Sequence, residues 1–269
     1  MSFVVFVKKA PLNGAFFVGL VLSSAAYAIE DADCELKGAA EIVTAEHVHD
    51  GDTLRLHDGR KVRLIGINTP ERAREERVTE PLAEQARMAL QNMIGRHRQI
   101  RLVLGSEQKD RYGRILAHPF SLDGENLTAS LLKLGYGQHI VVPPNLKYYS
   151  CYRNSETSAR LTGKGVWQHA YYRPRNIEQL KPEYTGYQTV SGTITHIGNS
   201  RKSIWLNFGE RFSVHINRND LSYFATWKFS ELKGKVVEVR GWLRYYKGKQ
   251  QFRMQVRHPA AIVINQKHS

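Results

Sequence analysis

Three short runs near the start of the chain alternate apolar and polar residues, and Asp-Gly turns separate them. The runs are EIVTAEHV, DTLRLHD and KVRLIGI, between residues 41 and 67. Such alternation puts every second side chain on one face of a strand, and Asp-Gly favours tight connections between neighbouring strands. The pattern therefore predicts a β-meander.

A helical stretch follows this meander. It opens at Pro81, has apolar residues at helical spacing from Leu82 to Ile94, and stops at Gly95. Two more strands are expected in QIRLVLG and RILAHPF, and short helices near residues 126–134 and about 152–163. We predict a mainly β fold with helices (α+β), in which five strands form a barrel with about three helices.

The second half of the chain contains five more alternating runs. They are TVSGTITHI, SIWLNFG, FSVHI, VVEVRGWLRYY and QFRMQVRH, with a short helix expected near residues 220–224. Their order looks like a second small barrel of the oligonucleotide-binding (OB) type. The alternative is a plain β-barrel that stabilises the first domain.

Domain boundaries are expected around a proline-containing stretch of low apolar periodicity, YYRPRNIEQLKPEYTG. We expect an export signal at residues 1–28, a first domain at 29–170, a linker at 171–183 and a basic second domain at 184–269. The net charge is +14, of which residues 29–183 carry +2 and residues 184–269 carry +10. Only the second domain looks like a polyanion binder on charge alone.

The first 28 residues have the pattern of a signal peptide. Lys8 and Lys9 precede an apolar run at residues 16–26 and the small-residue site Ala-Tyr-Ala. A run of about 11 residues is too short for a membrane anchor, which needs ~20. No later segment is apolar enough to span, so no stable membrane association is expected after cleavage. We expect an exported protein, periplasmic or secreted, and no protein partner can be inferred.

Two cysteines, Cys34 and Cys151, remain after the expected cleavage. An exported protein folds in an oxidising compartment, which favours a disulfide between them. The alternative is a pair of free buried thiols.

The stretch HVHDGDTLRL, at residues 47–56, raises the question of a metal site. A zinc hydrolase of the H-x-H-x-D-H type would need Asp at position 51 and His at 52, where this chain has Gly51 and Asp52. His47 and His49 share a strand face, so a surface site of two histidines stays open beside simple solvated histidines. Asp50 before Gly51 suits a tight turn. Asp52 remains to be explained.

Asp52 belongs to the first of three blocks, DGDT, RLIGINTPE and DRYGR, with a helical stretch between the second and third. These blocks, in this order, resemble the staphylococcal nuclease (thermonuclease) family over about residues 40–168. The resemblance implies an OB-type barrel and a secreted, calcium-dependent phosphodiesterase that acts on single-stranded DNA or RNA.

The resemblance also implies roles for individual residues. The implied Ca²⁺ ligands are Asp52, Asn68 and the carbonyl of Thr69, and the implied catalytic residues are Arg63, Glu71 and Arg114. These residue types suit phosphodiester cleavage, which needs cations aimed at the phosphate oxygens and a base for water. Arginine offers a planar fork of donors, and hard oxygen ligands favour calcium over zinc.

Two positions depart from the family pattern. Asn68 stands where the family usually has Asp, so the site loses one negative charge and weaker calcium binding is expected. The stretch HIVVPPN offers Ile140, Val141 and Val142 where the family often offers tyrosines that stack on a base. Base preference is therefore left open.

A face of the second domain is expected to bind nucleic acid. In VRGWLRYY the arginines, Trp242 and Tyr246 fall on one side of a strand, and the next strand also carries arginines on one side. Cationic strands with aromatic platforms are typical of single-strand binders. The alternative is that the first domain covers Trp242. The predicted nucleic-acid-binding residues are Arg240, Trp242, Arg244, Arg253 and Arg257.

Two functions fit these features. The first is an exported calcium-dependent endonuclease of the thermonuclease type, with single-stranded DNA or RNA as substrate. The alternative is a noncatalytic protein that binds nucleic acid or another polyanion and retains the nuclease fold. Arg63, Glu71 and Arg114 favour the enzyme, whereas Asn68 weighs against it.

Overall fold

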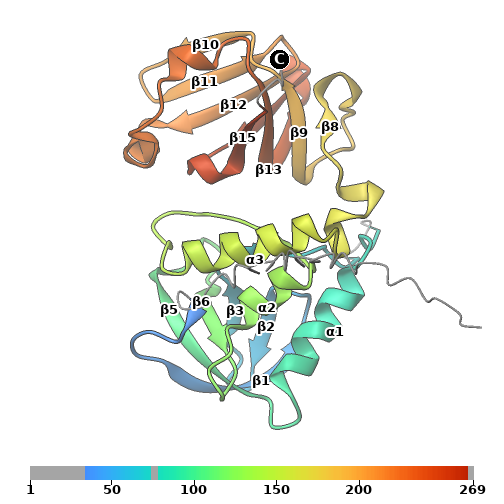
Figure 1. Cartoon of the computed structure of the whole chain (residues 1–269), viewed down its shortest axis with the longest axis vertical. Helices are drawn as coiled ribbons and strands as arrows, with labels where there is room; N and C mark the ends of the chain where they lie inside the picture. Colours follow the sequence, from blue (N-terminus) through green and yellow to red (C-terminus); the bar gives the residue numbers. More distant parts are fainter. Residues whose placement is uncertain (1–33, 74–77, 266–269) are drawn as a thin grey trace, which may run out of the picture. The chain divides into compact units, whose positions relative to one another are not determined.

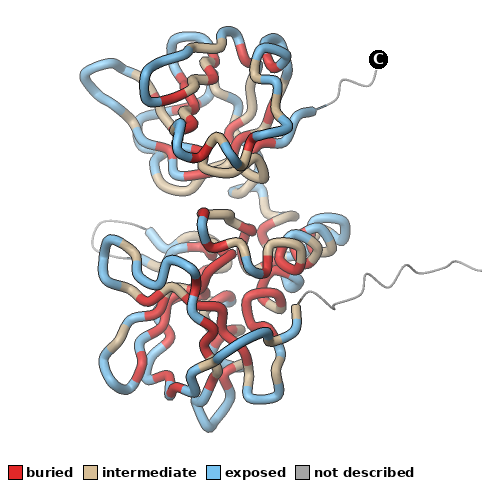
Figure 2. Tube along the Cα trace, turned by 90° about the vertical axis from the view of Figure 1, so that its left-hand side faces the viewer, coloured by how far each residue is buried: buried red, intermediate tan, exposed pale blue. Residues whose placement is uncertain are grey.

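A computed structural model describes residues 34–73 and 78–265 of the chain. The predicted signal at residues 1–28 lies outside these described residues. The described residues belong to one compact unit, which contains two hydrophobic cores, one between Val43 and Tyr152 and one between Leu180 and Ile262. Figure 2 shows buried segments in the interior of each barrel and exposed loops around them. None of the described helices is long and apolar enough to cross a membrane.

Five strands of the first half form a closed barrel in the order β1-β2-β3-β6-β5 (Figure 1). They are β1 (Glu41–Val48), β2 (Thr53–Leu56), β3 (Lys61–Leu64), β5 (Gln99–Lys109) and β6 (Ile115–Phe120). Neighbours are antiparallel except β3 and β6, which run parallel. The predicted meander is confirmed as β1, β2 and β3.

Three helices pack on this barrel, as predicted. They are α1 (Ala83–Ile94), α2 (Leu127–Lys133) and α3 (Tyr149–Leu161). Gly95 ends α1 with φ of 72°, a conformation that favours glycine, and the Asn126 side chain caps α2 by accepting a hydrogen bond from the Ala129 N–H at 3.1 Å. A two-stranded sheet of β4 (Ile67–Asn68) and β7 (Gln138–His139) lies beside the barrel. The α+β fold class is confirmed.

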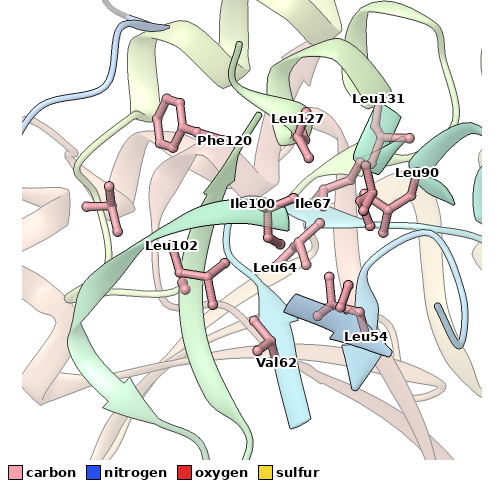
Figure 3. Packing of buried hydrophobic residues seen from close by; sticks show 14 of the residues in the cluster. Leu54, Val62, Leu64, Ile67, Leu90, Ile100, Leu102, Phe120, Leu127 and Leu131 are labelled. Atoms are coloured by element: carbon pink, nitrogen blue, oxygen red, sulfur yellow. The ribbon is translucent and has the colours of Figure 1, made fainter. Parts of the chain in front are cut away.

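The core of the first barrel is made by the apolar members of the alternating runs. Figure 3 shows Leu54, Val62, Leu64 and Ile100 pointing inward, together with Leu90 from α1. Each is at most 1% exposed. Burial of one such side chain contributes about 1.5–3 kcal/mol to stability. The polar residues that alternate with them point outward, where they can form a site.

The expected disulfide is present between Cys34 and Cys151. The two Cα atoms are 5.1 Å apart, and the bond links residues separated by 117 positions. Cys151 lies on α3 and is buried in the first core. In the simple loop model a closure of this length removes about 3–5 kcal/mol of unfolded-state entropy.

The second half forms an eight-stranded sheet in the order β10-β11-β12-β14-β13-β9-β8, with β15 also on β13. Its strands are β8 (Arg175–Asn176), β9 (Gly186–Thr193), β10 (His196–Asn199), β11 (Ser203–Phe208), β12 (Phe212–Asn217), β13 (Val236–Tyr246), β14 (Gln251–Gln255) and β15 (Ile262–Asn265). The short helix expected near residues 220–224 is the 3-10 helix at Arg218–Phe224.

One bent segment closes this second sheet into a barrel. β9 pairs with β13, β10 pairs with β11, and only Ile194 and Thr195 separate β9 from β10. The closed path then has the same order as the first barrel, and again the third and last strands run parallel, here β12 and β14. This repeated topology supports the interpretation of both halves as OB-type barrels.

The predicted linker, residues 171–183, makes specific contacts. Ile177 and Leu180 pack into the second core, and β8 adds to the edge of β9. Tyr171 donates a hydrogen bond from its hydroxyl to Glu80 at 3.3 Å. The stretch has little apolar periodicity because only isolated residues in it make these contacts. The boundaries at residues 170 and 183 stay predictions.

A buried histidine should make the fold sensitive to acid. His118 on β6 is 1% exposed, its Nδ1 lies 2.8 Å from the Tyr152 hydroxyl, and burial lowers its pKa to about 3. Below about pH 6.5 the His118 imidazole is therefore protonated in the unfolded chain but stays neutral in the folded chain. The free energy of unfolding then falls as the pH drops from about 6.5 towards 3. We expect His118 to account for about 2 kcal/mol of the stability lost between pH 7 and 5.

Urea unfolding at both pH values measures this loss. His118→Gln should flatten the pH dependence, whereas His57→Gln, at an exposed position, should not. An unchanged slope in His118→Gln would contradict the assignment.

Candidate active site

A buried carboxylate, that of Asp52, connects the start of β2 with the end of β3 and the loop after it. Asp52 is 2% exposed and lies in the turn before β2. Its Oδ2 accepts a hydrogen bond from the Thr69 N–H at 2.8 Å and lies 3.0 Å from Nη1 of Arg63 on β3. The first two sequence blocks, DGDT and RLIGINTPE, are therefore joined through Asp52.

Gly51 allows this contact because the turn packs against two other segments. A Cβ at position 51 would lie 2.7 Å from the Thr69 Cγ2 and 2.8 Å from the Cβ of Ala86 on α1, distances that real Cβ atoms do not show. The Asp50 side chain accepts a hydrogen bond from the Asp52 N–H at 3.1 Å. Asp50 thus has the turn role expected from the sequence, and Gly51 sets how closely the turn approaches Thr69.

Arg63 holds the loop that follows its own strand. Its Nη1 donates hydrogen bonds to the carbonyls of Leu64 at 3.0 Å and Ile67 at 2.9 Å, and its Nη2 donates to Oδ1 of Asn68 at 3.4 Å. The side chain is only 11% exposed. A guanidinium can make all of these contacts at once because its donors lie in one rigid plane.

Burial dominates the electrostatics of Asp52. Loss of solvent raises its pKa to about 6, against the lowering effect of Arg63 and with a further rise from Asp50. The positive charge of Arg63 therefore does not offset the cost of burying the ionised form of Asp52. Added positive charge next to Asp52 would favour that form.

The donor set suits a hard cation. The predicted ligands offer a carboxylate from Asp52, an amide oxygen from Asn68 and a main-chain carbonyl from Thr69, and the Asn68 Nδ2 lies 3.5 Å from that carbonyl. The hydroxyl of Thr69 is buried and has no hydrogen-bond partner among the residues that the structure describes. Within residues 34–73 and 78–265, no cluster of three His, Cys, Asp or Glu side chains could hold a metal. An oxygen set of this kind fits Ca²⁺ better than a transition metal.

Glu71 lies on an exposed loop just after β4, next to the start of α1. Two hydrogen bonds fix the loop, because the Glu71 N–H donates to Oε2 of Glu80 at 2.9 Å and the Glu80 N–H donates to the Glu71 carbonyl at 2.9 Å. The backbone at position 71 is therefore held in place while the residue faces solvent.

Arg114 immediately precedes β6, the strand that runs parallel to β3 and its Arg63. The parallel pairing sets Arg63 opposite Leu116, two residues beyond Arg114 and on the same side of the strand. The two arginines are thus offset by about 7 Å along the strand direction. Arg114 itself pairs with Asp110 at 2.7 Å. The contacts join Asp52, Arg63, Asn68 and Thr69, and only the strand register relates Arg114 to this group.

Comparison with known proteins matches this part of the chain. The family model "Staphylococcal nuclease homologue" matches residues 61–169. The chain is 31% identical over 137 residues to Thermonuclease of Staphylococcus intermedius, which covers 50% of this chain and 79% of the relative. The chain belongs to the staphylococcal nuclease family. It is also 30% identical over 128 residues to Thermonuclease of Staphylococcus hyicus, covering 45% of this chain and 73% of the relative.

A third relative matches a longer stretch of this chain. Endonuclease YhcR of Bacillus subtilis (strain 168) is 24% identical over 174 residues, which is 60% of this chain and 14% of the relative. The family model ends at residue 169, before the second barrel begins. The family model therefore does not cover that barrel.

The residues predicted to bind nucleic acid in the second barrel are placed in different settings. Arg240 is 12% exposed and forms two hydrogen bonds of 2.7 Å with Glu156 of α3, and Arg257 pairs with Asp220 at 3.2 Å. Trp242 is 45% exposed. Arg240 and Arg257 are thus occupied by ion pairs, which periodicity along one strand cannot reveal.

Arg244 and Arg253 do lie opposite each other on neighbouring strands, β13 and β14. Their neighbour Trp205 on β11 was not predicted, although the alternation of its strand indicates an outward side chain. In SIWLNFG the residues Leu206 and Phe208 are buried, so Trp205 falls on the outward side of that alternation.

Proposed function

We propose that this member of the staphylococcal nuclease family is a calcium-dependent nuclease that hydrolyses phosphodiester bonds of single-stranded DNA or RNA. The observation that carries the proposal is the buried Asp52 in contact with Arg63 and Thr69, with Glu71 on the adjoining loop. Relatives named Thermonuclease and Endonuclease support a nuclease as the class of enzyme.

The residues present would divide the reaction between them. Ca²⁺, when held by Asp52, Asn68 and the Thr69 carbonyl, would supply positive charge next to the scissile phosphate. Glu71 accepts a proton from the water that attacks phosphorus, since it is an exposed carboxylate on a fixed loop. One P–O ester bond breaks as the new P–O bond forms, and the departing oxygen takes up a proton.

The arginines would stabilise the charge that builds up on the phosphate. A guanidinium stays ionised at all relevant pH values and donates two parallel hydrogen bonds to a pair of oxygens. Arg114 is 28% exposed, and among the described residues its one acidic partner is Asp110, bound through Nε, so its Nη groups can reach a ligand. Arg63 is more buried and holds Asp52 and the following loop as well.

The disulfide between Cys34 and Cys151 supports export, because such bonds persist in oxidising compartments. We propose a periplasmic or secreted enzyme. A noncatalytic binding protein remains the competing function, and it has the loss of one acidic ligand at Asn68 in its favour.

The calcium requirement gives a direct test. We expect the purified chain to digest single-stranded DNA with Ca²⁺ and to stop when a chelator is added. Asn68→Asp should lower the calcium concentration for half-maximal rate by about three- to tenfold, because a carboxylate adds charge to the donor set.

Asp58→Asn is a matched control, since Asp58 is an exposed carboxylate paired with Arg60 away from this site. It should leave the calcium requirement unchanged. Digestion that persists in the chelator would refute the calcium dependence, and binding without any digestion would favour the noncatalytic protein.

A further inference from the structure

One outward surface of the second barrel combines aromatic rings and arginines across four adjacent strands. We call it the aromatic–arginine face. Its members are Trp205 on β11, His215 on β12, Arg253 on β14, and Arg244 and Tyr246 on β13.

Strand register places these side chains together. Trp205 is paired with His215, and Arg253 with Arg244. The residues that alternate with them, such as Leu206, Val214 and Phe252, are at most 2% exposed and fill the barrel core. The five members therefore share the outer side of one continuous sheet.

Arg253 connects the two aromatic rings of this face. Its guanidinium carbon lies 5.3 Å from the centre of the Trp205 ring and 4.9 Å from the centre of the Tyr246 ring. Its Nε donates a hydrogen bond to Oε1 of Gln251 at 2.9 Å. These distances are within the range of cation–π contacts, so the rings and the charge are held in one arrangement before any ligand binds.

Trp205 is fixed from its other side as well. Its Nε1 donates a hydrogen bond to the Ser200 hydroxyl at 3.3 Å, and its ring centre lies 5.1 Å from that of His215. Tyr246 is 40% exposed. An aromatic side chain that is held in place but remains accessible is suited to pack against a flat partner.

The face carries two positive charges, those of Arg244 and Arg253. Within the described part of the chain, Arg244 and Arg253 have no ion-pair partner, in contrast to Arg240 and Arg257. Burial and these two arginines lower the pKa of His215, which is then neutral near pH 7. Residues 184–269 contain 14 Lys and Arg but only 4 Asp and Glu. The charge favours a polyanionic ligand.

Two basic loops extend this charge. Arg201 and Lys202 precede Trp205, and Lys247 and Lys249 follow Tyr246, all exposed. A path from one loop to the other crosses the rings and the two arginines. Such a path matches a chain that carries a phosphate on every unit and a flat base between phosphates.

We propose that the aromatic–arginine face binds single-stranded nucleic acid, with bases packed against Trp205 and Tyr246 and phosphates at Arg244 and Arg253. A duplex would offer the phosphates but keep its base faces stacked inside. An anionic membrane would offer charge without bases. The face shares no residue with the Asp52 cluster, so this inference goes beyond the proposed function and would hold for a noncatalytic protein too.

The test measures binding with cleavage switched off. The full chain carrying Glu71→Gln, in a chelator, is titrated with a labelled oligothymidine of about 20 nucleotides, longer than the ~4–16 that one such barrel covers. Trp205→Ala and Tyr246→Ala should each weaken binding at least about fivefold, the lower end of the effect of losing one stacked base.

Conservative and charge variants separate binding from folding. Trp205→Phe and Tyr246→Phe keep a ring and should bind within about threefold of the parent. Arg253→Gln should make the dependence of log affinity on log salt shallower by about 0.7. Lys233→Gln removes an exposed cation before β13, outside the face, and should leave affinity for the oligonucleotide nearly unchanged.

Several results would overturn the proposal. These are unchanged affinity in both Ala variants, equal losses in the Phe and Ala variants, or equally tight binding of a duplex or anionic vesicles by the parent. If Trp205→Ala fails to fold, the variants at the exposed Tyr246 and the partly exposed Arg253 still decide the outcome. Binding in the chelator is independent of hydrolysis, so the absence of nuclease activity would refute the proposed function alone.

Discussion

Replacing Glu71 by Gln should lower the turnover rate on single-stranded DNA by at least about 100-fold, the size of effect typical of a lost general base. The amide of Gln matches the carboxylate in size but cannot accept the proton from the attacking water. The loop is held through the backbone of Glu71, whose N–H and carbonyl bind Glu80, so the substitution leaves these contacts in place. We therefore expect nucleic-acid affinity to be retained.

Initial rates with saturating Ca²⁺, and oligonucleotide binding in a chelator, measure the two quantities separately. Glu84→Gln is the matched control, because Glu84 lies nearby on the first turn of α1 and pairs with Arg72 and Arg87 at the surface. It should keep nearly the parental rate. Equal rates for Glu71→Gln and the parent would remove Glu71 from the mechanism, and equal losses in both variants would point to the loop instead of the base.

Local patterns were sufficient for the elements of the first barrel. The runs that became β1, β2 and β3 alternate over four or more residues, and α1 shows a helical spacing that ends at a glycine. The same reasoning missed β8 and β15. β8 has two residues and β15 has four, and each derives its order from pairing with β9 or β13 rather than from its own sequence.

The sites depend on contacts between residues far apart in the sequence, which local patterns do not show. The motif blocks named Asp52 and Arg63, but the closeness of Gly51 to Thr69 and Ala86 depends on how the turn meets α1. Arg240 has the alternation of an exposed arginine, yet its partner Glu156 lies 84 residues away on a helix. A sequence pattern gives the side of a strand on which a residue lies, and only packing decides what covers that side.

Arg63→Lys should be as damaging as the loss of Glu71, and it should also lower stability. The guanidinium contacts the Leu64 and Ile67 carbonyls and both Asp52 and Asn68 through two nitrogens. Lysine has one nitrogen, so part of this set loses its donor in a site that is 11% exposed. We expect about 1.5–3 kcal/mol of lost stability and a turnover rate at least about 100-fold lower.

Denaturant unfolding and turnover, measured on the same preparation, tell the roles of Arg63 apart. Arg55→Lys is the control, because Arg55 lies on neighbouring β2 at the surface and pairs with Glu46 at 2.8 Å, where exchange should cost no more than about 0.5 kcal/mol.

A stability loss with normal turnover would make Arg63 a residue that only positions Asp52 and its loop. Normal stability with lost turnover would place its main contacts on the phosphate, and the Asp52 contact seen in the free protein would then give way when substrate binds. A variant unchanged in both would refute the role of Arg63 in this site, because neither the buried hydrogen bonds nor the charge on the phosphate can be reproduced by a single ammonium group.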